Sequence, residues 1–244
     1  MSVAVVTGAS RGIGRAITIA LAAEGFDIVA VARDRVALEE VSAVVQQSGR
    51  RCLALALDLG AADGPVTAAQ RAWDWSTEVT VVVNAAGLLV REPEASTDVS
   101  AWDRTIALNV KAPQILMEIL GRRMFDRGHG AIVNVASLAG EIVTRAPAAY
   151  QASKAALIQL TRFYAVQLAP KVRVNAVGPG YVRTDLNRTW LDVPENEEWV
   201  RSKTPLARVG VPDDVVGPVV FLATDRSSYV TGQHLLIDGG WGLV

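Results

Sequence analysis

The chain has 244 residues, of which half are apolar and a fifth are charged. This composition can bury a sizeable core, and the formal net charge of -1 gives no general attraction to nucleic acid or to anionic membranes. The single cysteine, Cys52, excludes an intrachain disulfide, and the amino terminus has no signal-peptide pattern. We therefore expect a soluble cytoplasmic protein with no nucleic-acid or membrane partner.

Short apolar runs alternate with longer amphipathic stretches along the whole chain. Seven runs predict strands at residues 2–6, 27–32, 52–57, 79–83, 131–135, 172–177 and 235–237. Between them, apolar spacing predicts helices at residues 12–23, 34–47, 102–125, 150–168 and 213–223. Continuously apolar strands that alternate with helices are typical of a parallel sheet covered on both faces. We expect a doubly wound α/β fold in one domain, residues 1–244.

Residues 178–212 are the least regular stretch, and a long connection beyond the carboxyl end of a strand is a common place for a substrate lid. We expect a lid over about 181–208, with further pocket residues at 88–92 and 138–145. The lid side chains suited to a carboxylate, a phosphate or a sugar face are Arg183, Asn187, Arg188, Trp190 and Trp199. Packing or solvation of each side chain is an equally good interpretation.

A glycine-rich turn follows the first predicted strand and opens the first predicted helix. It reads Thr7-Gly8-Ala9-Ser10-Arg11-Gly12-Ile13-Gly14. Glycines permit a tight turn and a close approach of phosphate to the backbone, and the helix start favours an anion. A lone glycine cluster can also be an ordinary turn. The strand–turn–helix context favours a dinucleotide loop, and its candidate contacts are Gly8, Ser10, Arg11, Gly12, Ile13 and Gly14.

The end of the second predicted strand distinguishes NAD(H) from NADP(H). A carboxylate there binds the ribose 2′-OH of NAD, whereas arginine accommodates the 2′-phosphate of NADP. Here Ala32 stands where the acid is expected, Arg33 follows it, and Arg11 lies in the glycine loop. Two guanidinium groups suit a phosphate dianion, so we favour NADP(H) over NAD(H). The alternatives are Asp34 on the ribose, and a solvated Arg33 that pairs with Asp34.

Two more segments follow predicted strands and are candidate nucleotide contacts. Asp58-Leu59 follows the third strand, where a side-chain acceptor can meet the adenine amino group. Asn84-Ala85-Ala86-Gly87 follows the fourth, where small residues let the backbone lie against the cofactor. Each segment alone is more typical of a strand cap or turn.

Tyr150 and Lys154 stand four residues apart at the start of a predicted helix, which puts them on one face. A phenol titrates near pH ~10 in water, and a nearby ammonium and a positively charged nicotinamide both lower that pKa. Tyr150 can then take the alcohol proton during oxidation, or donate it to the carbonyl oxygen during reduction. Ser137, at the end of the fifth predicted strand, can hydrogen-bond the same oxygen. By itself, the Tyr150–Lys154 spacing also fits a helix-surface pair.

Taken in order, these motifs resemble the short-chain dehydrogenase/reductase family over nearly the whole chain. The matching segments are Thr7-Gly8-x-x-x-Gly12-x-Gly14, Asn84-Ala85-Ala86-Gly87, Asn109, Ser137, Tyr150-x-x-x-Lys154, Asn175-x-x-x-Pro179-Gly180 and Ile237-Asp238-Gly239-Gly240. Within the family, the chain is similar to 3-oxoacyl-[acyl-carrier-protein] reductases and to sugar-acid dehydrogenases such as gluconate 5-dehydrogenase. One departure is Ala85, where the family usually has a second asparagine. That change removes an amide but no catalytic group.

The resemblance implies a seven-stranded (Rossmann) sheet and a catalytic tetrad of Asn109, Ser137, Tyr150 and Lys154. In this tetrad Ser137 orients the substrate and Tyr150 is the acid/base. Lys154 also binds the nicotinamide ribose, and Asn109 helps to hold a water that relays protons to Lys154. The further cofactor contacts that the resemblance implies are the backbone N–H of Ile13 at the pyrophosphate, and Pro179, Gly180, Val182 and Thr184 at the nicotinamide end.

The resemblance also implies interconversion of a ketone and a secondary alcohol, for which NADP(H) is the favoured cofactor. A metal-dependent reaction is disfavoured because His129 and His234 stand far apart in the sequence and Cys52 stands alone. The substrate would be a 3-oxoacyl thioester, a sugar acid or a polyol. Residues 106–125 and 150–168 are apolar almost all round, which fits the homotetramer that the family implies, or a homodimer. The alternative is a catalytically inactive NAD(P)-binding sensor, although such a protein would be expected to have lost Tyr150 or Lys154.

Overall fold

Seven apolar segments form one parallel sheet in the computed structural model, which describes residues 2–91 and 99–244. The strands are β1 (Val3–Thr7), β2 (Asp27–Ala32), β3 (Cys52–Ala56), β4 (Val79–Asn84), β5 (Gly130–Val135), β6 (Val172–Pro179) and β7 (His234–Ile237). Their spatial order is β3-β2-β1-β4-β5-β6-β7, so the direction of winding reverses between β1 and β4. The prediction of a doubly wound, seven-stranded sheet is confirmed.

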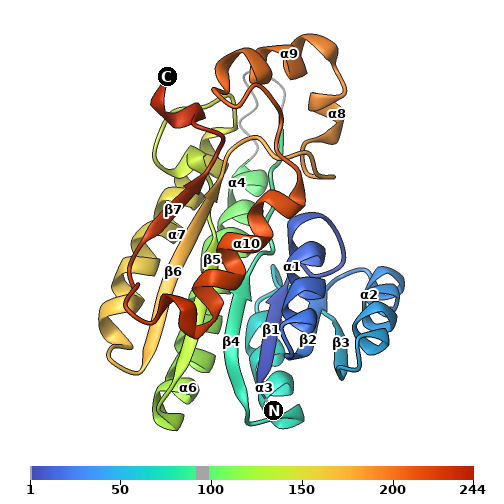
Figure 1. Ribbon diagram of the computed structural model, residues 1–244, viewed down its shortest axis with the longest axis vertical. Coiled ribbons are helices and arrows are strands. Elements are labelled where there is room, and N and C mark those ends of the chain that lie inside the picture. Colours follow the sequence, from blue (N-terminus) through green and yellow to red (C-terminus); the bar gives the residue numbers. More distant parts are fainter. Residues whose placement is uncertain (1, 92–98) are drawn as a thin grey trace.

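Helices cover both faces of the sheet (Figure 1). One layer holds α1 (Gly12–Ala23), α2 (Arg35–Gln47) and α10 (Pro212–Ala223), and the other holds α3 (Gly64–Trp75), α4 (Val99–Ile106), α5 (Ala112–Leu116), α6 (Arg122–Arg127) and α7 (Ala148–Gln167). In β1, Val3 and Val5 pack into one core, while Ala4 and Val6 pack into the other. Two cores require strands that are apolar on both faces, which explains the continuous runs in the sequence.

Most predicted boundaries fall within two residues of the observed ones. Helix α3 is the main omission from the prediction. It begins at Gly64-Pro65, and the side chains that it buries are small, as at Ala68, Ala69 and Ala72. A helix is recognised in a sequence by the regular spacing of large apolar residues, and alanines contribute little to that pattern. The sequence therefore does not predict α3.

The helix predicted at residues 102–125 is observed from α4 to α6, but it is not regular. Two π-helical turns interrupt it, at Ala107–Lys111 and Met117–Gly121. Insertions of this kind are rare and often lie at functional sites. The first of them contains Asn109, which is buried.

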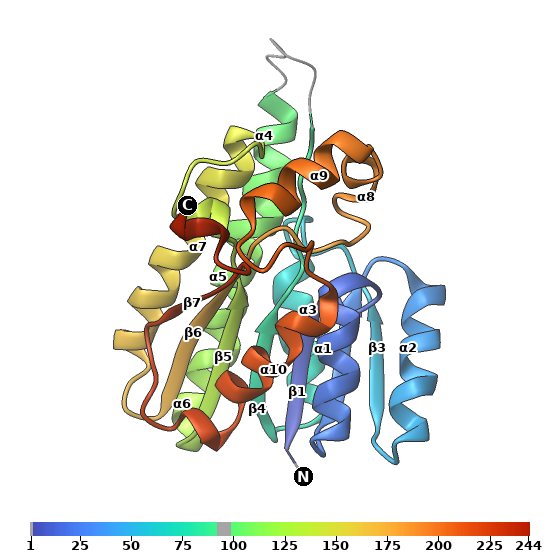
Figure 2. The ribbon, with the colours of Figure 1, turned by 45° about the horizontal axis from the view of Figure 1, so that its top comes forward.

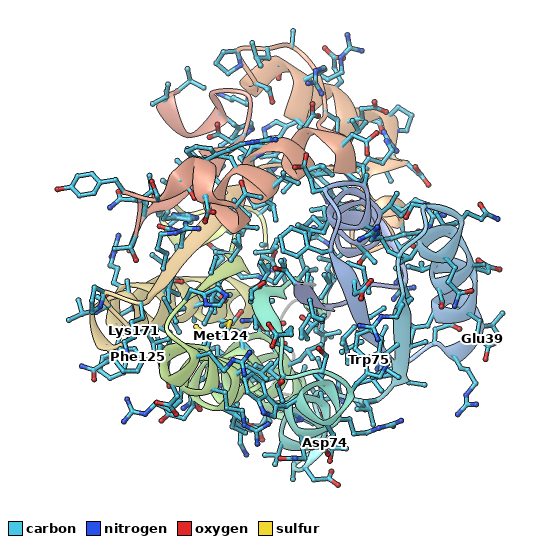
Figure 3. The ribbon with its side chains drawn as sticks, turned by 60° about the horizontal axis from the view of Figure 1, so that its bottom comes forward. Glu39, Asp74, Trp75, Met124, Phe125 and Lys171 are labelled. Carbon is cyan, nitrogen blue, oxygen red and sulfur yellow. The ribbon has the colours of Figure 1, made fainter. Side chains whose placement is uncertain are left out.

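The lid predicted at about 181–208 contains two short helices, α8 (Arg188–Leu191) and α9 (Pro194–Lys203). Both lie beyond the carboxyl ends of the strands (Figure 1, Figure 2). At the opposite end of the molecule, the ammonium of Lys171 lies 4.5 Å from the centre of the Phe125 ring (Figure 3). Within the described ranges, no helix has both the length and the apolar character to cross a membrane.

Candidate active site

A cavity of about 680 Å³ lies where the carboxyl ends of the strands meet the lid. It brings together nearly all of the predicted site residues. Those that line it are Gly8, Ser10, Arg11, Gly12, Ile13, Gly14, Arg33, Asp58, Leu59, Ala85, Ala86, Gly87, Ser137, Tyr150, Lys154, Pro179, Gly180, Val182 and Thr184. The two exceptions, Asn84 and Asn109, are buried behind its wall.

The glycine loop forms one end of the cavity and packs backbone against backbone. A Cβ atom at Gly14 would overlap the carbonyl oxygen of Gly8, and one at Gly8 would lie 2.9 Å from the backbone nitrogen of Ala86. Gly8 and Gly12 also have φ angles of +67° and +54°, which favour glycine. Helix α1 starts at this loop with its first N–H groups free of helical partners. The loop therefore fits the pyrophosphate of a dinucleotide.

Thr7 fixes the neighbouring loop, a role that the sequence did not reveal. Its hydroxyl oxygen accepts hydrogen bonds from the backbone N–H groups of Ala85 (3.0 Å) and Ala86 (3.1 Å). The same hydroxyl donates to the carbonyl of Val83 at 3.4 Å. Thr7 thus joins the end of β1 to the small-residue segment after β4, where both form the cavity wall.

The residues predicted to select the cofactor line the same cavity as the glycine loop. The Asp34 carboxylate accepts a hydrogen bond from the Ala37 N–H at 3.1 Å and caps the start of α2. Arg33 lines the cavity and has no hydrogen bond or ion pair to another described residue. The Arg33–Asp34 pair considered as an alternative is therefore not observed. The Nε atom of Arg11 lies 4.0 Å from a carboxylate oxygen of Asp185 in the lid. In the adenine region, Asp58 accepts from the Gly60 N–H at 2.9 Å in a turn.

Tyr150 and Lys154 project from the first turns of α7 beside Ser137, which follows β5. The Lys154 ammonium donates to the Val135 carbonyl at 2.8 Å and lies 5.5 Å from the centre of the Tyr150 ring. Burial lowers the pKa of Lys154 to about 8. Burial also raises the pKa of Tyr150 above its ordinary value, and the hydroxyl of Ser137 opposes that rise. The lowering expected from the ammonium together with a positively charged nicotinamide stays a prediction, since burial and the Ser137 hydroxyl are the two influences that act on the pKa of Tyr150 within the chain.

Asn109 ties the segment after β4 to helix α7. Its amide group donates to the Leu88 carbonyl at 2.9 Å and to the Ser153 hydroxyl at 3.0 Å. Its carbonyl oxygen accepts from the Leu88 N–H at 2.8 Å. Since Ser153 precedes Lys154, these bonds hold the lysine's turn of α7 against the cavity wall. A Cβ atom at Gly87 would lie 3.7 Å from the Lys154 nitrogen, which places this segment next to the lysine.

The side chain of Asn84 does not line the cavity, so a cofactor contact of this residue stays a prediction for its backbone alone. It donates to the Asn134 amide oxygen at 2.8 Å, and Asn134 donates to the Thr161 hydroxyl at 2.9 Å. This buried chain of polar groups joins β4, β5 and α7. Asn84 therefore lies under the site, because the last residue of a strand directs its side chain to one face of the sheet only.

The tryptophans of the lid pack on one another. Trp190 and Trp199 meet edge to face at 6.2 Å, and the Tyr181 ring stacks on Trp190 at 5.7 Å. Trp241, near the carboxyl terminus, completes this cluster, 5.8 Å from Trp199. Of the two interpretations open for Trp190 and Trp199, packing is the one observed. Tyr181 is the member of the cluster that lines the cavity.

The lid arginines are neutralised within the lid. Arg183 pairs with Asp192 and Glu197, each at 2.8 Å, and Arg188 pairs with Asp185 at 2.6 Å. Their predicted contact with a substrate anion is therefore not supported.

A different cation, Arg91, faces the cavity. Its guanidinium lies 5.1 Å from the Trp190 ring and donates to the Arg145 carbonyl at 3.3 Å. It has no acidic partner among the described residues. Arg91 falls in the predicted pocket segment 88–92, whose last residue, Glu92, lies outside the described residues.

Comparison with known proteins connects this site to one family. A family model described as enoyl-(acyl carrier protein) reductase matches residues 8–242. A 2-dehydro-3-deoxy-D-gluconate 5-dehydrogenase of Bacillus subtilis is 35% identical, over 98% of this chain and 93% of its own. A galactitol 2-dehydrogenase (L-tagatose-forming) of Cereibacter sphaeroides is 38% identical, over 98% and 94%. Proteins named 3-oxoacyl-[acyl-carrier-protein] reductase also match.

A solved structure is similar over the whole chain. It is a gluconate 5-dehydrogenase of Burkholderia cenocepacia in complex with NADP and tartrate, with 28% identity and a TM-score of 0.93, covering 100% of this chain and 96% of that one. The protein described here belongs to the short-chain dehydrogenase/reductase family. It is an NAD(P)-dependent oxidoreductase that acts on CH–OH groups.

Proposed function

We propose that the protein interconverts a secondary alcohol and a ketone on a polyhydroxy carboxylic acid, with NADP(H) as its cofactor. The observation that carries the choice of substrate is Arg91, a cation in the cavity wall with no acidic partner among the described residues. A substrate carboxylate would supply the missing partner, because arginine binds carboxylates strongly. The sugar-acid dehydrogenases among the relatives, and the tartrate bound to the Burkholderia protein, support the same class.

Tyr150 acts as the acid/base in this proposal. In reduction its hydroxyl donates a proton to the carbonyl oxygen, and in oxidation its phenolate takes the proton of the alcohol. Because burial raises the pKa of Tyr150, the hydroxyl stays protonated at neutral pH, which suits reduction. The Ser137 hydroxyl orients the substrate oxygen, and the Lys154 ammonium stabilises the phenolate that reduction leaves behind. Asn109 maintains the turn of α7 on which Lys154 lies.

The cavity offers groups for each part of NADP(H), which supplies or accepts the hydride when bound. The glycine loop and the start of α1 suit the pyrophosphate. Arg33 and Arg11 suit the 2′-phosphate, and the carboxylate of Asp34 is already engaged in capping α2. The residues that would border the adenine are Asp58 and Leu59, and those that would border the nicotinamide are Pro179, Gly180, Val182 and Thr184.

The cofactor preference can be tested at Arg33. The Arg33→Ala variant should raise the KM for NADPH by roughly 10–100-fold, since it removes one charge-assisted contact to the 2′-phosphate, and change that for NADH by less than about twofold. Arg35→Ala is the matched control, because Arg35 is also exposed but does not line the cavity. Wild-type enzyme that prefers NADH, or equal losses for both cofactors in Arg33→Ala, would contradict the assignment.

The substrate class can be tested at Arg91. The Arg91→Met variant keeps an apolar stem and removes the guanidinium, and with it the contact of that group with the Trp190 ring. We expect the KM for a sugar acid to rise by roughly 10–100-fold, with the KM for the corresponding uncharged polyol unchanged. Arg201→Met, at an exposed arginine of α9, is the control.

An equal effect of Arg91→Met on the acid and the polyol would argue against a carboxylate at Arg91. If the wild-type enzyme turns over 3-oxoacyl thioesters and not sugar acids, the proposed substrate is wrong. The substrate would then belong to the other class that the sequence indicated.

The homotetramer stays a prediction. In the single chain, Phe163 and Val166 of α7 are exposed apolar side chains, as an interface on that helix requires. Light scattering from the purified protein measures the number of subunits, and a stable monomer would contradict the prediction.

A further inference from the structure

The segment between Ser137 and helix α7 forms one wall of the cavity. Leu138, Ala139, Thr144 and Ala146 from this segment line the cavity near Tyr150. Residues 141–147 contain no helix or strand. Only the ends of the segment bond to neighbouring helical backbone, the N–H groups of Glu141 and Ile142 to the Leu138 carbonyl and the Pro147 carbonyl to the Gln151 N–H. Between these ends, the backbone of the wall is held by side-chain hydrogen bonds, one of them from the Ala146 N–H to the Thr144 hydroxyl.

Gln151 makes most of these contacts. Its amide oxygen accepts a hydrogen bond from the Thr144 N–H at 3.1 Å. Its amide nitrogen donates to the carbonyls of Ala146 at 2.7 Å and Thr144 at 3.3 Å. One side chain thus holds three backbone groups at the two positions of the segment that line the cavity beside Tyr150. At the other end of the segment, the Glu141 carboxylate lies 2.6 Å from the buried ring of His234.

These bonds bear on the active site because Gln151 is next to Tyr150 in the chain. Gln151 directly follows Tyr150 in the first turns of α7, so both are fixed to the same helical backbone. The three bonds of Gln151 therefore tie the wall at Thr144 and Ala146 to the helical turn that carries Tyr150. A local role, in which Gln151 only caps the approach to α7, would affect stability alone and not the binding of substrate.

We propose that Gln151 is a positioning residue for the substrate, which sets the wall at Thr144 and Ala146 relative to the Tyr150 hydroxyl. The inference rests on the proposed function only in placing the substrate between Tyr150 and this wall. It requires no particular class of substrate.

The test compares Gln151→Met with Gln159→Met. Methionine matches glutamine in length and helix propensity but cannot make the three hydrogen bonds. Gln159 is an exposed residue of the same helix, so its replacement controls for a new methionine on α7. Two quantities are measured: amide hydrogen exchange of the peptide that contains residues 141–147, and steady-state kinetics with the wild-type enzyme's carbonyl substrate.

In Gln151→Met we expect exchange at Thr144 to accelerate by roughly tenfold or more, and the KM for substrate to rise by roughly tenfold. The kcat and the dissociation constant of NADPH should change by less than about threefold, and Gln159→Met should match wild type. Unchanged exchange would show that Gln151 does not hold the wall. Faster exchange with an unchanged KM would overturn its role in substrate positioning.

The same experiments distinguish an error in the proposed substrate from an error in the role of Gln151. Wild-type enzyme that turns over no polyhydroxy acid contradicts the proposed substrate alone. Exchange at Thr144, and the KM for whichever carbonyl compound is turned over, still decide the role of Gln151.

Discussion

Replacing Tyr150 by phenylalanine is expected to lower kcat by roughly 10²–10⁴-fold, which is the usual contribution of a general acid or base. Phenylalanine keeps the ring that packs in the cavity wall and loses only the hydroxyl. Binding of NADPH should therefore change little, because the nucleotide is held mainly by the glycine loop and the arginines. Kinetics in both directions, together with a fluorescence titration of NADPH, measure the two effects separately.

The matched control is Tyr229→Phe. Tyr229 is fully exposed and does not line the cavity, so its loss of a hydroxyl should leave kcat at the wild-type value. Near-wild-type turnover in Tyr150→Phe would remove Tyr150 from the mechanism. Loss of NADPH binding along with turnover would instead indicate a structural role for the hydroxyl.

Replacing Lys154 by methionine is expected to lower kcat by at least ~100-fold and yet stabilise the protein at neutral pH. Burial lowers the pKa of Lys154 from 10.5 to about 8, so the folded state disfavours the charged form. Below pH 8 both the folded and the unfolded chain carry the proton, and the cost of the buried charge is fully present. That cost is ~3 kcal/mol, of which loss of the bond to the Val135 carbonyl cancels about 1 kcal/mol.

The sign of the pH dependence follows from the same shift. Between pH 8 and 10.5 the unfolded chain binds a proton that the folded chain has released, so wild-type stability rises with pH in this window. The advantage of Lys154→Met in thermal unfolding should therefore be constant below pH 8, at roughly 5 °C in Tm, and disappear towards pH 10.5. Lys171→Met, at the opposite end of the molecule (Figure 3), is the control. A Lys154→Met variant that is less stable than wild type at pH 7 would contradict the account.

The fold could be predicted in most of its detail because the signals that define it are local. Strands buried on both faces must be continuously apolar, and each of the seven runs became a strand. Helix α3 was missed because it buries alanines, and the π-helical turn at Asn109 was missed because apolar spacing does not register one inserted residue. Both omissions are features that tertiary packing decides.

The candidate site could be predicted where the backbone itself makes the site, and where the motifs place Ser137, Tyr150 and Lys154. Gly8, Gly12 and Gly14 form the loop because no other residue fits there, and their spacing shows it. The lid is different, because its arginines and tryptophans can satisfy one another as well as a ligand. The sequence could not show that Arg183 pairs inside the lid while Arg91 remains open to the cavity.

The reaction that we propose is hydride transfer between NADP(H) and a keto group of a polyhydroxy acid. The direct measurement uses NADPH that carries deuterium at the transferable position of the nicotinamide, with keto sugar acids as substrates and mass spectrometry of the product. We predict that the deuterium appears on the new carbinol carbon with wild-type enzyme, and that Tyr150→Phe transfers it at least ~100-fold more slowly. If the protein binds NADPH but transfers no deuterium to any keto acid, neutral ketone or 3-oxoacyl thioester, hydride transfer is excluded. That result would indicate a nucleotide-binding sensor.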